Sequence, residues 1–176
     1  MLGIERVPKI GRLLVEFGHL AVHEMVLTPR KIQWLWEECQ KYPTLFNDLT
    51  KGDIRNFIEF LETESSYWME VYDTRNLVGI IYIMNLDQIT DCDCHMIFFD
   101  RKANDKVPLC RAMIRWMFKE FRVHRVSAPV PSIYHATIRL VKNIGFKHEG
   151  TKRETLMIGG RWVDELQFGI LEVEMH

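Results

Sequence analysis

The sequence predicts a mixed α/β (α+β) fold, with a mixed central sheet of about seven strands flanked by about four helices. Two observations support this prediction. Segments with the apolar spacing of amphipathic helices alternate with β-rich runs in the order βααβββαβαββ. The chain is also 176 residues long and 47% hydrophobic, which suffices for one well-buried core. Because no repeat, linker or low-complexity segment divides it, we expect residues 1–176 to form a single domain.

The amino-terminal half predicts strands at residues 20–27, 67–72 and 77–84, preceded by residues 1–19 as either an extension or an early strand. Two helices lie between the first and second of these strands. Thr28 caps the first helix, and Pro29 suits its first position because an N–H there has no helical partner. Thr50 and Asp53 resemble a capping box with Asp in place of Glu, so the second helix runs to about Glu62.

The carboxy-terminal half predicts strands at residues 95–99 and 123–130, each followed by a helix. Pro108 opens the first of these helices. Ser132 caps the second, which ends at Gly145 because glycine tolerates the left-handed backbone of a helix terminus. A terminal hairpin follows. Gly159-Gly160 permits the positive backbone angles of its tight primed turn.

The charge of the chain is divided unevenly along its length. Residues 101–161 hold 14 Lys or Arg against 4 Asp or Glu, a balance of +10 in a chain whose net charge is −1. Such a block attracts polyanions, including nucleic acid or the phosphates of a nucleotide cofactor. The alternative is a solvated basic surface without a partner.

Several protein classes are excluded by composition. No apolar run reaches the roughly 20 residues that span a bilayer, and the amino terminus lacks an apolar stretch followed by a cleavage site. Four cysteines, at positions 39, 92, 94 and 110, are too few and too unevenly placed for a secreted disulfide scaffold. We therefore expect a cytoplasmic protein with reduced thiols and no membrane partner.

The run Cys92-x-Cys94-His95 suggests a metal site, but two features weigh against it. Adjacent Cys94 and His95 would point to opposite sides of a strand. No second pair of cysteines stands at the spacing of a structural zinc site. We expect no metal.

A set of short motifs in the carboxy-terminal half points to one family. These are Thr137-Ile138-Arg139-Leu140, Gly145-Phe146, Glu149-Gly150, Arg153 and Gly160-Arg161-Trp162-Val163-Asp164, with Phe118 and the strand through Arg125. In this order they resemble the GNAT superfamily of acetyl-CoA N-acetyltransferases, above all the branch that acetylates ribosomal-protein amino termini. At the level of pattern the resemblance covers about residues 20–173. It implies the GNAT fold, with a splayed pair of parallel strands, and direct transfer of acetyl from acetyl-CoA to a primary amine in a ternary complex.

The resemblance also implies where acetyl-CoA, the cosubstrate, binds. Its pantetheine arm would hydrogen-bond the backbone of the strand at residues 95–99, as an added strand would. Its pyrophosphate would lie on the following loop and on the amino terminus of the next helix. The cofactor-binding residues implied are Ile97, Phe98, Phe99, Arg101, Lys102, Ala103, Asn104, Asp105, Lys106 and Val107, with Tyr134 and Thr137 from the later helix.

The pyrophosphate loop departs from the family pattern. Arg101 fits, but Asn104 and Lys106 stand where the family has Gly and then Gly or Ala. Asn104 still tolerates a left-handed turn. The bulky Lys106 either blocks close approach of the phosphates or, together with Lys102, contacts them as a point charge. The loop is therefore a degenerate version of the motif.

Thr137 is the candidate for the general acid, and Tyr134 is a second candidate site residue. Thr137 stands where the amino-terminal acetyltransferases often have a Ser, and it could protonate the departing thiolate of CoA. The alternative is a helical Thr that bonds back to the preceding turn. Tyr134 replaces an Asn that contacts CoA in the family. It is either a substitute donor or a packed aromatic residue.

The amine must lose a proton, so a base is also expected. His95 has a suitable unperturbed pKa of about 6.5. Glu149, Glu154 and Asp164 on the terminal hairpin are further candidates. Asp164 matches the branch motif, and it either holds the amino terminus of a peptide substrate or orders the hairpin.

Two other functions remain open on the sequence. One is a catalytically weakened GNAT-like binding module that uses the basic segment 101–161 for nucleic acid or an acidic partner. The other is a structural subunit that associates through the Trp-rich first helix. A homodimer is compatible with any of these functions, and the acceptor is either a protein amino terminus or a small-molecule amine.

Overall fold

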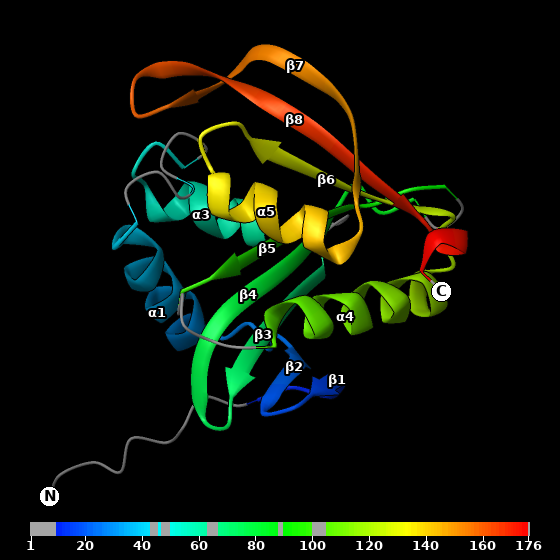
Figure 1. The fold of residues 1–176 in the computed structure, drawn as a ribbon. Coiled ribbons are helices and arrows are strands. Elements are labelled where there is room, and N and C mark those ends of the chain that lie inside the picture. Colours follow the sequence, from blue (N-terminus) through cyan, green and yellow to red (C-terminus); the bar gives the residue numbers. More distant parts are fainter. Residues whose placement is uncertain are drawn as a thin grey trace, which may run out of the picture.

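The computed structural model describes residues 10–42, 46, 50–62, 67–87, 90–99 and 105–175. Its eight strands form one sheet in the spatial order β1-β2-β3-β4-β5-β6-β8-β7 (Figure 1). The strands are β1 (Leu13–Phe17), β2 (Leu20–Glu24), β3 (Tyr67–Asp73), β4 (Asn76–Met84), β5 (Asp93–Phe98), β6 (Arg125–Pro131), β7 (Lys147–Ile158) and β8 (Arg161–Leu171). The labelled helices are α1 (Pro29–Gln40), α3 (Ile54–Leu61), α4 (Lys106–Phe121) and α5 (His135–Ile144), followed by the 3-10 turn η1 (Glu172–Glu174). No described helix is long and apolar enough to span a bilayer.

The sheet has one strand more than the seven predicted. The additional strand is β1, which pairs antiparallel with β2 across a turn at Gly18, where φ is 61°. Of the two alternatives for residues 1–19, the early strand is confirmed for residues 13–17, while residues 1–9 lie outside the described part of the chain. The strand escaped a firm prediction because it is a largely exposed edge strand without a clear apolar alternation.

The helix starts agree with the predictions only in part. Thr28 caps α1 as predicted, accepting a hydrogen bond from the backbone of Lys31 at 3.2 Å. The predicted capping box before α3 is wrong in detail, because Asp53 is itself the N-cap. Ser132 does not cap α5 either. Tyr134 occupies that position, since Ser132 lies in the turn after β6 and donates its N–H to Asp164.

Both faces of the sheet are covered by helices. α4 and α5 pack together over one face, and α1 and α3 lie over the other (Figure 1). The α4/α5 face holds a core that includes Ile81 and Met113, and the α1/α3 face holds a second core that includes Phe57 and Tyr82. Because side chains alternate along a strand, Ile97 and Phe99 pack on the α1/α3 side, while Cys94, Met96 and Phe98 belong to the α4/α5 side.

The predicted splay of two parallel strands is present between β5 and β6. Their one bridge joins Asp93 to Ser127, near the start of both strands. By contrast, β5 pairs with β4 along its whole length, from Asp93 to Phe98. Beyond Asp93 the two parallel strands therefore diverge and leave the β6 side of β5 without a backbone ladder.

Candidate active site

The closed end of the splay is held by a polar cluster that we call the vertex clasp: Asp91, Arg125, Ser127 and Glu149. The Asp91 carboxylate accepts hydrogen bonds from the Ser127 hydroxyl at 2.7 Å and from Nε of Arg125 at 3.2 Å. The rest of the Arg125 guanidinium grips both oxygens of Glu149 on β7. This contact lowers the pKa of Glu149 and raises that of Arg125. Glu149, a candidate base from the sequence, is thus engaged in joining strands.

The open part of the splay exposes peptide groups of β5. Phe99 donates its N–H to Val78 at 2.8 Å, so the odd-numbered residues of β5 direct their peptide groups toward β4. The peptide groups of Met96 and Phe98 therefore face the gap. Of the three strand residues predicted to bind the cofactor, Phe98 presents its backbone to the gap, and Ile97 and Phe99 do not. The sequence reasoning missed Met96, which the period of two would have identified once Phe98 was placed.

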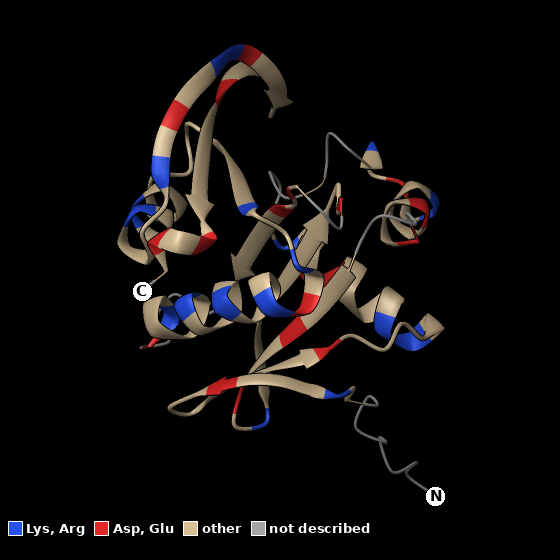
Figure 2. Ribbon diagram, turned by 90° about the vertical axis from the view of Figure 1, so that its right-hand side faces the viewer, with Lys and Arg blue, Asp and Glu red and all other residues tan. Residues whose placement is uncertain are grey.

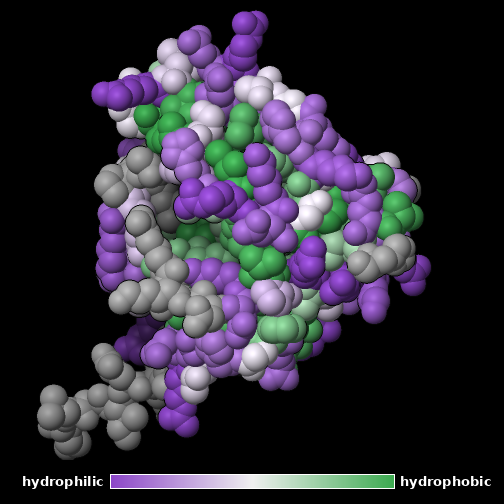
Figure 3. All heavy atoms as spheres, viewed as in Figure 1, coloured by the Kyte–Doolittle hydropathy of each residue, from purple (hydrophilic) through white to green (hydrophobic). Residues whose placement is uncertain are grey.

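The surface is hollowed beside these strands. In the space-filling view, a hollow with a hydrophobic floor lies between α5 and the carboxyl end of β5 (Figure 3). Met96 and Phe98 are partly buried on this side of the sheet, where they pack against the α4/α5 core. An elongated ligand lying here would touch apolar side chains along its body and backbone groups along β5.

The amino terminus of α4 lies next in the chain after the end of β5. Asp105 precedes the helix with a φ of 64°, and its side chain makes no capping hydrogen bond. The helix dipole adds positive potential at this amino terminus. The ammonium group of Lys106 lies 5.2 Å from the centre of the Phe98 ring. A cationic group thus stands beside the end of β5, where a phosphate would be attracted.

Only the last residues of the predicted pyrophosphate loop belong to the described part of the chain. Residues 101–104 lie outside the described residues, so the predicted roles of Arg101, Lys102, Ala103 and Asn104 stay predictions. Asp105 and Lys106 bound the start of α4, and Val107 packs partly buried against the α4/α5 core.

Tyr82 of β4 lies between two of the candidate catalytic side chains, Tyr134 and His95. Tyr134 precedes α5 and lies close enough to Tyr82 of β4 to contribute to the raised pKa of the Tyr82 phenol, whose main cause is burial. Tyr82 in turn stacks on His95 of β5, with ring centres 4.5 Å apart and planes 5° apart. Tyr134 therefore reaches from α5 toward the β4–β5 side of the gap. Thr137, also partly exposed, follows in the first turn of α5.

His95 ends a column of stacked rings on the α1/α3 face. Trp68 stacks on Tyr82 at 4.5 Å, and Tyr82 stacks on His95. Burial lowers the pKa of His95 to about 4, so the imidazole is neutral at pH 7. A neutral imidazole can accept a proton, although this low pKa makes it a weaker base than its unperturbed value suggested.

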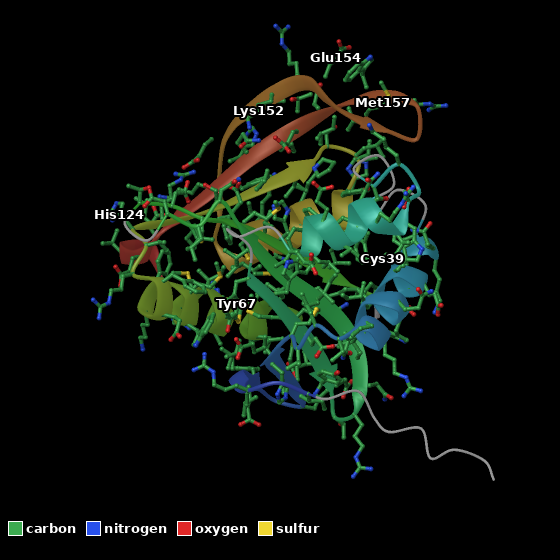
Figure 4. The ribbon with its side chains drawn as sticks, turned by 180° about the vertical axis from the view of Figure 1, so that it is seen from behind. Cys39, Tyr67, His124, Lys152, Glu154 and Met157 are labelled. Atoms are coloured by element: carbon green, nitrogen blue, oxygen red, sulfur yellow. The ribbon has the colours of Figure 1, made fainter. Side chains whose placement is uncertain are left out.

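Asp164 orders the terminal hairpin, as one of the two predicted alternatives stated. Its carboxylate accepts the backbone N–H of Glu154 at 2.8 Å. This contact holds a bulge in β7 where Glu154 has a φ of 47°. Arg153, Glu154 and Asp164 border a hollow of about 670 Å³ on the hairpin. Figure 4 shows Lys152, Glu154 and Met157 on this hairpin, which arches over the rest of the molecule.

Many basic side chains of segment 101–161 are used within the fold. Lys and Arg recur along α4 and alternate with acidic residues on the hairpin (Figure 2). Arg111 donates to the carbonyl of Ile144 at the end of α5, and Arg115 donates to the carbonyl of Met175. Lys147 pairs with Glu174, and Lys152 with Glu165. Within the described part of this segment, the local positive charge is therefore partly compensated by acidic residues near the end of the chain.

The cysteines lie in the interior. All four are buried and free, and burial raises the pKa of Cys92 to about 12. At neutral pH these thiols are protonated and poorly nucleophilic. Within the described ranges no three His, Cys, Asp or Glu side chains gather as metal ligands.

Comparisons with known proteins agree with this geometry. Residues 46–167, more than half of the chain, match the family described as "Acetyltransferase (GNAT) domain". The uncharacterized N-acetyltransferase YnaD of Bacillus subtilis (strain 168) is 33% identical over 66 residues, a match that spans 38% of this chain and 39% of YnaD. The probable N-acetyltransferase YjcK of the same organism is 24% identical over 124 residues, or 67% of this chain and 68% of YjcK.

A solved structure shows the same fold. The spermidine N-acetyltransferase of Vibrio cholerae, crystallised in complex with CoA and spermine, superposes with a TM-score of 0.74 over 89% of this chain and 98% of its own. At 16% identity this likeness establishes the fold alone. The region that matches the family includes the splayed strands and both helices that flank their gap. The chain therefore belongs to the GNAT acetyltransferase domain family.

Proposed function

We propose that this protein transfers the acetyl group of acetyl-CoA directly to a primary amine in a ternary complex, within one domain over residues 1–176. One observation carries the proposal: the β5–β6 ladder ends after a single bridge, and the amino terminus of α4 follows the open end of β5 in the chain. A gap with open peptide groups suits the amides of a pantetheine arm, and the positive end of a helix dipole suits a pyrophosphate.

Different groups of the chain would bind different parts of acetyl-CoA. Met96 and Phe98 offer gap-facing peptide groups to the arm. The amino terminus of α4 offers the positive end of its dipole to the pyrophosphate, and Lys106 adds a positive charge at the end of β5. These contacts offset the missing glycines of the degenerate loop, because the helix terminus and the lysine supply the attraction that the loop backbone supplies in other members.

The transfer forms a C–N bond and breaks a C–S bond. The amine nitrogen attacks the thioester carbonyl carbon, and a gap-facing N–H of β5 stabilises the negative charge that develops on the oxygen. Thr137 or Tyr134 gives its proton to the departing thiolate. His95, neutral at pH 7, accepts the proton of the amine directly or through water. Because His95 belongs to the α1/α3 face, the acceptor approaches from that side.

Two features support a primary amine as the acceptor. The structural neighbour from Vibrio cholerae acts on spermidine, and the motifs around Gly145-Phe146 and Gly160-Asp164 resemble enzymes that act on protein amino termini. Both acceptors present a primary amine. The resemblance to the ribosomal-protein branch favours a protein amino terminus, and the predicted homodimer stays a prediction.

Binding of acetyl-CoA tests the proposal at its base. At a ligand concentration 100 times Kd, binding stabilises the folded state by about 2.7 kcal/mol, which raises Tm by roughly 5–10 °C. Titration calorimetry and thermal melts with acetyl-CoA measure this effect, with adenosine monophosphate as the control ligand. An unchanged Tm at millimolar acetyl-CoA would contradict the proposal.

The general acid is tested by substitution at position 137. Thr137→Ala should lower kcat by about 100-fold with little change in the Kd for acetyl-CoA, because the hydroxyl acts only when the thiolate departs. Thr137→Ser is the matched control and should keep most of the activity. If Thr137→Ala retains full kcat while Tyr134→Phe loses it, the acid is Tyr134.

A further inference from the structure

Strand β6 carries two prolines on the edge that faces β5. Arg125 donates its N–H to Thr90 and Ser127 donates its N–H to Cys92, so the odd-numbered residues direct their N–H groups toward the β5 side. The even-numbered residues face β8, with which β6 pairs along its full length. By this alternation the next two donors toward β5 belong to positions 129 and 131. Both positions are proline, which has no N–H.

The ladder stops where these donors stop. In a parallel register that continued from Ser127, position 129 would donate to the carbonyl of Cys94 and position 131 to that of Met96. The single observed bridge, Asp93 with Ser127, lies immediately before the first missing donor. β6 is an interior strand of the sheet, between β5 and β8, where proline is normally disfavoured. Two prolines on the same edge of such a strand therefore need a reason.

We propose that Pro129 and Pro131 are positioning residues that hold the gap between β5 and β6 open in the free protein. Without N–H donors, β6 cannot close onto β5, and the carbonyl groups of Cys94 and Met96 stay open to a ligand's amides. A binding groove kept open in this way costs the ligand no energy to separate two paired strands. The inference rests on the proposed function, because it concerns the groove to which acetyl-CoA is assigned.

Restoring the donors tests the idea. In Pro129→Ala and in the double variant Pro129→Ala/Pro131→Ala, the strands can form one or two additional hydrogen bonds across the gap. The double variant should bind acetyl-CoA about tenfold more weakly by calorimetry, because binding must first break those bonds. KM for acetyl-CoA should rise to a similar extent, while kcat at saturation stays near the wild-type value.

Hydrogen exchange at the new backbone amide measures directly whether β6 has paired with β5. The amide introduced at position 129 should be protected in the free variant and should lose protection when acetyl-CoA is added. Pro29→Ala, on the exposed start of α1, is the matched control for the general effect of removing a proline. It should lower Tm by about 2 °C through the unfolded chain and leave acetyl-CoA binding unchanged. The Tm of the double variant should fall by less than that of the control, or should rise, because the new hydrogen bonds stabilise the folded state.

The outcomes separate this inference from the proposed function. If the wild-type protein does not bind acetyl-CoA, the proposed function fails, while protection of the new amide still reports whether the gap can close. If the wild type binds and the double variant binds equally well, with an unprotected amide at position 129, the prolines do not hold the gap open. If Pro129→Ala fails to fold, Pro131→Ala at the end of the strand replaces it. Its new amide at position 131 and its affinity for acetyl-CoA should show the same changes with a smaller magnitude.

Discussion

At the scale of single residues, His95 shows how burial alters a side chain's chemistry. The sequence indicated an imidazole of ordinary pKa, and desolvation of the ring, which stacks on Tyr82, lowers the pKa to about 4. The same shift links His95 to stability. The unfolded chain binds a proton at His95 below about pH 6.5, whereas the folded protein binds it only below about pH 4.

His95 should therefore make the folded state less stable as pH falls. Between about pH 6.5 and pH 4 the unfolded state binds more protons, so stability is lost progressively through this window. From pH 7 to pH 5 the loss amounts to about 2 kcal/mol. Urea unfolding at the two pH values measures it. His95→Phe, which keeps a ring to stack on Tyr82, should remove this part of the pH dependence, and an unaltered dependence would refute the assignment.

At the scale of elements, α1 is joined to the sheet by a buried ion pair that the sequence did not reveal. Lys31 of α1 is 2% exposed and Glu70 of β3 is fully buried. The ammonium of Lys31 binds one oxygen of Glu70, and the hydroxyl of Tyr72 donates to the same oxygen at 3.3 Å. The pair determines how α1 lies on the side of the sheet from which we expect the acceptor to approach.

Replacing one partner of this ion pair should destabilise the protein more than replacing both partners. Lys31→Met leaves the Glu70 charge buried without its partner, so we expect a loss of about 3–5 kcal/mol in the free energy of unfolding. The double variant Lys31→Met/Glu70→Gln should recover most of this loss, because no uncompensated charge remains. Chemical unfolding of the three proteins measures the effect. A cost below about 1 kcal/mol for Lys31→Met would show that the pair is dispensable.

At the scale of the whole molecule, the vertex clasp joins the two parts of the sheet. Its contacts run from the segment before β5, through Arg125 and Ser127 of β6, to Glu149 of β7. Gly169 of β8 lies beneath it, and a Cβ atom there would be 2.3 Å from the Arg125 guanidinium. The clasp therefore closes the same gap that the prolines of β6 leave open at its other end.

Gly169→Ala should loosen this closure. The added methyl displaces the guanidinium, which can move only by leaving Glu149 or Asp91, at an expected cost of about 1–3 kcal/mol. KM for acetyl-CoA should rise, because the two strands are no longer held at a defined separation. Gly150→Ala is the matched control, since a Cβ at that position meets nothing within 4 Å. Equal Tm and KM values for the two variants would argue against a role for the clasp.

Local sequence patterns were sufficient to predict most of the helices and strands. Thr28-Pro29 started α1, and Gly159-Gly160 formed the predicted turn with φ values of 58° and 75°. These features depend on neighbours in the chain, so they are readable without the fold. The starts of α3, α4 and α5 were misplaced: Asp53 rather than Thr50 caps α3, α4 begins at Lys106 and not at Pro108, and Tyr134 rather than Ser132 precedes α5.

The sequence alone determined the order of strands and helices, the family resemblance and the positions of Pro129 and Pro131, because periodicity, turn chemistry and a missing N–H are local properties. Only the tertiary structure decided which peptide groups of β5 face the gap, that His95 is desolvated and stacked, and that Asp91, Arg125 and Glu149 meet. These facts depend on strand register and desolvation, which arise when segments far apart in the chain are brought together.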